Sequence, residues 1–127
     1  MKAILQRVTF AEVKVDGNTV GKIDNGFLIL LGVAEGDTEK EADALSSKIA
    51  TLRVFTDEND KMNLSLIDTS GEMLIVSQFT LCGDCKKGTR PSFDKSAPPE
   101  VANELYEYFI KEVQSYGIKA GTGVSAQ

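Results

Sequence analysis

Two apolar runs constrain the fold of this chain more than any other feature of its sequence. Residues 27–34 read FLILLGVA and residues 73–81 read MLIVSQFTL, so apolar side chains fall on both faces of each run. Strands with this pattern are covered on both sides, as in sheets that have helices packed on them. The two runs therefore predict central, buried strands, and the second run loses its apolar character at Ser77 and Gln78.

The segment before the first run predicts shorter strands. Val, Ile and Phe are frequent in this segment, and apolar and polar residues partly alternate along it, which is typical of half-buried strands. The predicted strands are residues 2–10, 12–16 and 19–24. Asp16-Gly17-Asn18 predicts a hairpin turn, because Gly and Asn tolerate a positive φ.

Two later segments predict helices. Thr38-Glu39-Lys40-Glu41 has the form of a capping box, and apolar residues follow it at helical spacing: Ala42, Leu45, Ile49 and Leu52. Pro98-Pro99-Glu100 suits the first turn of a second helix, and Gly117 suits its end. We expect the buried face of that helix to consist of Val101, Leu105, Phe109 and Val113.

The order of these segments indicates the fold class. Strands come first, and helices then alternate with strands, without a repeat or a linker. We therefore expect one α/β domain spanning residues 1–127, an ordinary length for a domain. Its mixed sheet is predicted to be strongly curled and barrel-like, with two helices packed on it.

Composition excludes several classes of function. The chain has no histidine, so Ser-His-Asp and Cys-His nucleophile pairs are excluded. Its net charge is −5, which disfavours binding nucleic acid, DNA included, by bulk charge and leaves a local basic patch as the alternative. The longest apolar run is far too short to span a bilayer, and the N-terminus has no signal-peptide core, so we expect no membrane contact and a cytoplasmic location.

The first candidate site is Ser77-Gln78-Phe79-Thr80. Polar residues here interrupt a buried strand at its end, where α/β proteins place ligands. Gln78 supplies a donor and an acceptor, Thr80 supplies a hydroxyl, and the backbone amides around Phe79 suit a developing oxyanion. The alternative is a strand that simply reaches solvent.

The second candidate site is the basic loop that contains Lys86, Lys87 and Arg90. Three cations within five residues are unusual in an acidic chain, and Arg90 can bind phosphate through two parallel hydrogen bonds. Phe93, which follows them, can stack on a base. The alternative is an ordinary solvated loop.

The third candidate is the pair Cys82 and Cys85. A CxxC sequence can be a redox pair or half of a zinc site. The chain has no other Cys and no His that would complete four ligands, so only a second copy could supply them. We expect two reduced thiols, no bound metal and no cofactor.

Several short motifs together resemble one family across essentially all 127 residues. The chain is similar to D-aminoacyl-tRNA deacylases in these segments, in this order: Ala3-Ile4-Leu5-Gln6-Arg7-Val8, Gly32-Val33, Lys61-Met62-Asn63-Leu64, Val76-Ser77-Gln78-Phe79-Thr80-Leu81, Arg90-Pro91-Ser92-Phe93, and Leu105-Tyr106 with Tyr108-Phe109. The resemblance implies an esterase that cleaves D-amino acids, and glycine mischarged on the alanine tRNA, from the terminal ribose of tRNA. It also implies a two-fold homodimer with active sites at the interface and no cofactor.

The resemblance assigns roles to the candidate residues. Ser77, Gln78, Phe79 and Thr80 would line the site, with the Phe79 amide and the Gln78 region holding the ester carbonyl. The ribose 2′-hydroxyl of the substrate would activate water, because an unassisted threonine hydroxyl is a weak nucleophile and Thr80 suits a supporting role. Further supporting residues would be Arg7, Pro91, Ser92 and Phe93. From charge alone, we expect Lys86, Lys87 and Arg90 to contact acceptor-stem phosphates.

The end of the sequence departs from the family pattern. Family members continue after a Gly-Val like Gly123-Val124 into a strand with Asn-x-Gly-Pro-Val-Thr, whereas this sequence ends at Ser125-Ala126-Gln127. In the family, that Gly-Pro segment excludes L-amino acids and Arg7 braces it. This difference leaves open the alternative of an RNA-binding homodimer without turnover. The pair Cys82 and Cys85 leaves open a second alternative, a thiol or zinc protein.

Overall fold

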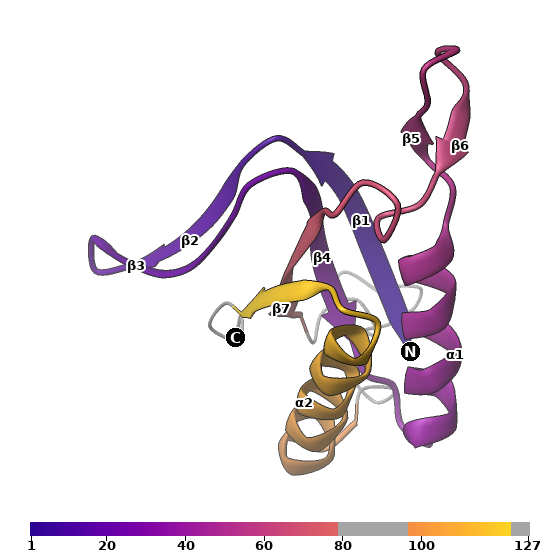
Figure 1. The fold of residues 1–127 in the computed structure, drawn as a ribbon. Coiled ribbons are helices and arrows are strands. Elements are labelled where there is room, and N and C mark those ends of the chain that lie inside the picture. The colour runs from indigo at the N-terminus through magenta and orange to yellow at the C-terminus, as the bar shows by residue number, and fades with distance from the viewer. Residues whose placement is uncertain (79–96, 123–127) are drawn as a thin grey trace, which may run out of the picture.

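The computed structural model describes residues 1–78 and 97–122. Its centre is a four-stranded mixed sheet in the order β1–β4–β7–β8 (Figure 1). The four strands are β1 (Lys2–Val8), β4 (Gly26–Gly32), β7 (Glu72–Ser77) and β8 (Lys119–Thr122). β1 runs antiparallel to β4, whereas β4, β7 and β8 are parallel to one another.

The two apolar runs form the centre of this sheet, as the sequence predicts. Phe27, Ile29 and Leu31 of β4 and Met73 and Ile75 of β7 face the hydrophobic core. The core is completed by residues of two helices, α1 (Glu39–Thr51) and α2 (Pro99–Ser115), which pack on the same face of the sheet. The expectation of a mixed α/β domain with two helices on a sheet is confirmed.

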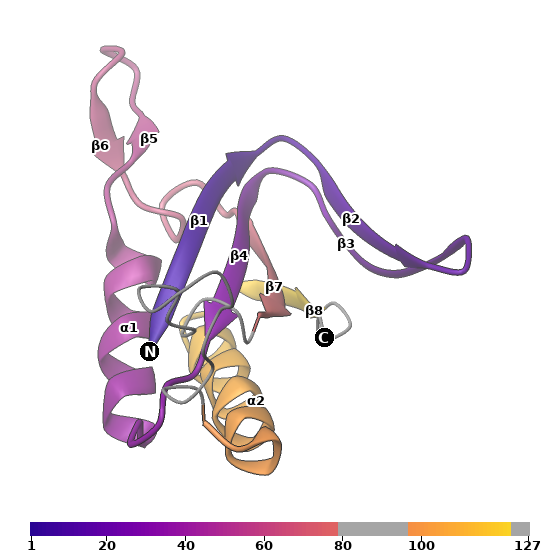
Figure 2. The same ribbon diagram turned by 180° about the vertical axis from the view of Figure 1, so that it is seen from behind.

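Two short ribbons extend from this core. One is the antiparallel pair β2 (Ala11–Val15) and β3 (Asn18–Ile23), and the other pairs β5 (Phe55–Thr56) with β6 (Met62–Leu64). The β5–β6 ribbon stands away from the body of the domain in Figures 1 and 2, whereas the β2–β3 ribbon contacts β7 and β8 through β3 and projects beyond the sheet at its turn. The β2–β3 turn follows the sequence prediction, although Asp16 and Gly17, rather than Asn18, take the positive φ.

The prediction of a strongly curled, barrel-like sheet is wrong for the part of the chain that the structure describes. The sheet there is open, with β1 and β8 at its edges. The predicted strand 2–10 ends at Val8, because the β1–β4 ladder stops at the pair Val8 and Gly26. A separate ladder begins at Ala11 and Ile23, so the chain bends out of the main sheet instead of closing it.

The helix boundaries follow local sequence signals. Thr38 caps α1, its hydroxyl accepts from the amide of Lys40, and the Glu41 carboxylate accepts from the amide of Thr38, so the capping box is confirmed. α2 starts at Pro99, and Gly117 follows its end with φ +81°. Two expected core residues are exposed, because Leu52 follows the last turn of α1 and Val101 lies in the first turn of α2.

In the described ranges, no helix is long and apolar enough to cross a bilayer.

We predict that Gly26→Ala destabilises the fold far more than Gly36→Ala. Both glycines have a positive φ, but a Cβ at position 26 would overlap the carbonyl oxygen of Glu72, whereas position 36 faces open space. The expected loss is about 3 kcal/mol at position 26, because a packed backbone must move, and about 1 kcal/mol at position 36. Chemical denaturation of the two variants measures the difference, and equal losses would contradict the close approach of β4 to β7.

Candidate active site at the end of strand β7

Two of the predicted site residues lie where the parallel strands β4 and β7 end together. Ser77 is in register with Leu31, and the amide of Gln78 donates to the carbonyl oxygen of Leu31 at 2.8 Å. Both residues are half-buried, so their polar side chains are partly accessible. The carboxyl ends of parallel strands are the usual place for ligand sites in open α/β sheets.

The end of β4 also fixes the point where α2 begins. The amide of Ala97 donates to the carbonyl oxygen of Val33 at 3.1 Å, two residues beyond the contact of Gln78 with Leu31. Gln78 and Ala97 are the described residues on either side of residues 79–96. The chain therefore leaves β7 and re-enters the described structure at the same end of β4.

The other predicted residues of this region lie outside the described residues. They are Phe79, Thr80, Cys82, Cys85, Lys86, Lys87, Arg90, Pro91, Ser92 and Phe93. The oxyanion, phosphate and thiol assignments that rest on them stay predictions.

Arg7 lies at the opposite end of the sheet from Ser77. Arg7 is in register with Phe27, which pairs with Met73, four residues before Ser77 on the same strand. Four residues of extended strand correspond to about 13 Å. The Arg7 Nη1 donates to the carbonyl oxygen of Val54 at 2.6 Å and so ties β1 to the base of the β5–β6 ribbon. Within one chain, the structure does not bring Arg7 together with Ser77 and Gln78.

A residue that sequence reasoning did not place in the site contacts the same strand. Tyr106 on α2 is buried, and its hydroxyl donates to the carbonyl oxygen of Ile75 at 2.5 Å. Tyr106 belongs to a motif of the family resemblance, but its spacing alone indicates only a core position. A tyrosine on the apolar face of a helix usually needs a hydrogen-bond partner for its hydroxyl. This requirement is the sequence signal that indicates a contact between Tyr106 and another element.

The clear pKa shifts among the described residues occur at caps and turns rather than at this strand end. Hydrogen bonds from Thr38 lower the pKa of Glu41, and a backbone amide of Lys61 lowers that of Asp57. Hydrogen bonds from Ser65 lower the pKa of Asp68. The Asp43 carboxylate, which accepts from the Tyr108 hydroxyl, raises the pKa of that tyrosine. These groups stabilise local structure and supply no acid or base near Ser77.

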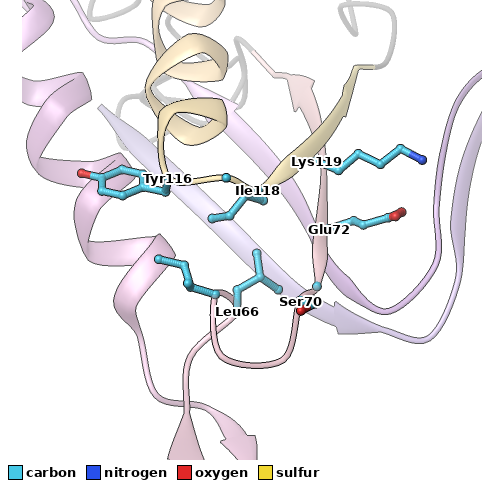
Figure 3. A pocket seen from close by; sticks show the side chains of 9 residues that line it. Leu66, Ser70, Glu72, Tyr116, Ile118 and Lys119 are labelled. Carbon is cyan, nitrogen blue, oxygen red and sulfur yellow. The ribbon is translucent and has the colours of Figure 1, made fainter.

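A pocket of about 240 Å³ lies at the other end of β7 (Figure 3). Leu66, Ile118 and Tyr116 contribute apolar surface, while the side chains of Glu72 and Lys119 extend away from the Tyr116 ring. The described residues contain no cluster of three or more His, Cys, Asp or Glu side chains that would hold a metal. The charged side chains that line this pocket, Glu72 and Lys119, both point away from the Tyr116 side of it.

The fold and the strand end place this chain in a broad class of proteins. The class consists of small mixed α/β domains with polar residues at the carboxyl end of a parallel strand pair. The family model for D-Tyr-tRNA(Tyr) deacylase matches residues 4–126. This match covers nearly the whole chain, and the chain belongs to that family. The resemblance stated from the sequence motifs is confirmed.

Individual relatives support the same assignment. A D-aminoacyl-tRNA deacylase of Geotalea uraniireducens is 59% identical over 124 residues, which cover 98% of this chain and 80% of that protein. The corresponding protein of Thermosipho africanus is 56% identical over 123 residues, covering 97% and 83%. A solved structure of the c-Myc DNA unwinding element binding protein is 38% identical with a TM-score of 0.89, covering 97% of this chain and 84% of that one.

Proposed function

We propose that this chain hydrolyses the ester bond of D-aminoacyl-tRNA and releases free tRNA and the D-amino acid. The observation that carries the proposal is the family match over residues 4–126, which includes the whole Ser77–Thr80 segment. Glycyl-tRNA mischarged on the alanine tRNA is a second proposed substrate, since glycine has no side chain to select against. We place this activity in the cytoplasm, as expected for a proofreading step on charged tRNA.

The proposed reaction is an attack of water on the ester carbonyl carbon. The Phe79 amide and the Gln78 region hold the carbonyl oxygen as it becomes negative, the role of an oxyanion hole. The bond from the carbonyl carbon to the ribose 3′-oxygen then breaks. That oxygen takes one proton of the attacking water, the second proton goes to solvent, and the amino acid is released as a carboxylate. The substrate's own 2′-hydroxyl activates the water, which suits a chain without histidine. Ser77 and Thr80 line the site in supporting roles.

The proposed function predicts that the 127-residue chain cleaves D-tyrosyl-tRNA above the spontaneous rate. Cleavage of the D form alone would support both the reaction and chiral selection by these 127 residues. Cleavage of matched D- and L-tyrosyl-tRNA alike would support the reaction without chiral selection. If neither substrate is cleaved, the proposed function is wrong, and retained tRNA binding would then favour the RNA-binding alternative.

Lys86, Lys87 and Arg90 are proposed to contact acceptor-stem phosphates, with Arg7, Pro91, Ser92 and Phe93 as supporting residues. Replacing the three cations by Ala should weaken tRNA binding and lower the slope of log affinity against log salt by about 2 to 3, since each lost phosphate contact removes nearly one unit. Binding measured between low and moderate salt gives the slope. The control variant has Lys40, Lys48 and Lys111 replaced by Ala. If the two variants have the same slope, the assignment of Lys86, Lys87 and Arg90 is wrong.

We also propose a two-fold homodimer. Among the strands that the structure describes, β1 lies at an edge of the sheet, and such edges favour pairing with another chain. Large apolar side chains are exposed on β1 and along the β2–β3 ribbon: Ile4, Phe10, Val15 and Val20. Exposed apolar surface of this kind is typical of an interaction site.

The dimer proposal predicts that charges on the ribbon separate the protomers. Val15 and Val20 are 40% and 44% exposed, so Val15→Asp with Val20→Asp should leave the fold intact and yield a monomer by light scattering at micromolar concentration. Val101→Asp is the matched control, because Val101 is equally exposed at the start of α2. A wild-type monomer, or a ribbon variant with the wild-type mass, would contradict the proposal.

A further inference from the structure

We propose that Tyr106 is a positioning residue that holds the end of β7, and with it Ser77 and Gln78, in the geometry needed for hydrolysis. The inference rests on the proposed function for its kinetic consequence. Its structural basis is the buried hydrogen bond from the Tyr106 hydroxyl to the carbonyl oxygen of Ile75, two residues before Ser77.

The two sides of β7 are held differently at this point. The amide of Gln78 donates to Leu31, so the peptide groups of residues 76 and 78 face β4. Because successive residues of a strand direct their peptide groups to opposite sides, the Ile75 carbonyl faces β8. The described part of β8 ends at Thr122, directly opposite Ile75. The Tyr106 hydroxyl therefore binds β7 on the side where the described ladder stops.

The surroundings make this hydroxyl important for the local backbone. Ile75 is fully buried and Tyr106 is 8% exposed, so water is a poor substitute for the lost donor. Removing a donor from a buried carbonyl costs free energy, which a small shift of the strand can reduce. The helix that carries Tyr106 is itself anchored in the core by Phe109 and Val113, which gives the hydroxyl a fixed position.

A small shift at Ile75 would be passed directly to the proposed site. Only Val76 separates Ile75 from Ser77, and Gln78, which is proposed to hold the ester carbonyl, follows directly. Misplacement of reacting groups by about 1 Å can cost on the order of a hundredfold in rate. A partial shift of the strand end is therefore expected to lower kcat more than it changes binding of the tRNA.

The experiment compares Tyr106→Phe with Tyr108→Phe. Each variant removes one hydroxyl from the same helix, but the Tyr108 hydroxyl donates to Asp43 of α1 at 2.7 Å and does not contact β7. With D-tyrosyl-tRNA as substrate, Tyr106→Phe should lower kcat about tenfold and leave KM within about twofold. Tyr108→Phe should leave both constants at the wild-type values.

Amide hydrogen exchange tests the positioning independently of activity. In Tyr106→Phe, protection of the Gln78 amide should fall about tenfold, while the Ile29 amide in the centre of β4 keeps its wild-type protection. Tyr108→Phe should change neither amide. If the wild-type chain hydrolyses nothing, the proposed function fails, and the exchange comparison still decides the role of Tyr106.

Three results would overturn the inference. The first is a Tyr106→Phe variant with wild-type kcat and wild-type Gln78 exchange. The second is a loss of protection at both Gln78 and Ile29, or an unfolded variant, because the hydroxyl would then support the whole fold rather than the strand end. The third is an equal loss of kcat in the two variants.

Discussion

The parallel pairing of β4 with β7 is the interaction on which the rest of the structure depends. Its register runs from Gly26 opposite Glu72 to Leu31 opposite Ser77. Both strands are apolar on both faces, so they are stable only when helices cover one side and β3 approaches the other. This one ladder therefore determines where the helices pack and where the first polar residues emerge.

The two ends of that ladder have different characters. At its beginning, β4 approaches β7 so closely that only glycine fits at position 26. At its end, the backbone of Gln78 binds Leu31 while α2 contacts Ile75 through the Tyr106 hydroxyl. The first end stabilises the fold, and the second presents the half-buried polar side chains of Ser77 and Gln78, which the proposed reaction uses.

Sequence patterns predicted the local features of this fold because each depends on near neighbours. The capping box at Thr38 and the change in polarity at Ser77 are examples, and both are found where the sequence indicates them. The curvature of the sheet was not predicted correctly, because it depends on how the β2–β3 ribbon bends after Val8. The bond from Tyr106 to Ile75 joins residues 31 apart, and no local pattern specifies such a contact.

The most direct measurement of the central claim is where a substrate analogue binds. A D-tyrosyl-adenosine in which an amide replaces the ester would be added to the chain, and backbone amide resonances would be followed by NMR. If the substrate binds at the end of β7, we expect large changes in the amide chemical shifts of Ser77 and Gln78. We expect no change at Ser70 and Lys119, which lie at the opposite end of β7. Shifts confined to Ser70 and Lys119, or no shifts at saturating analogue, would contradict it.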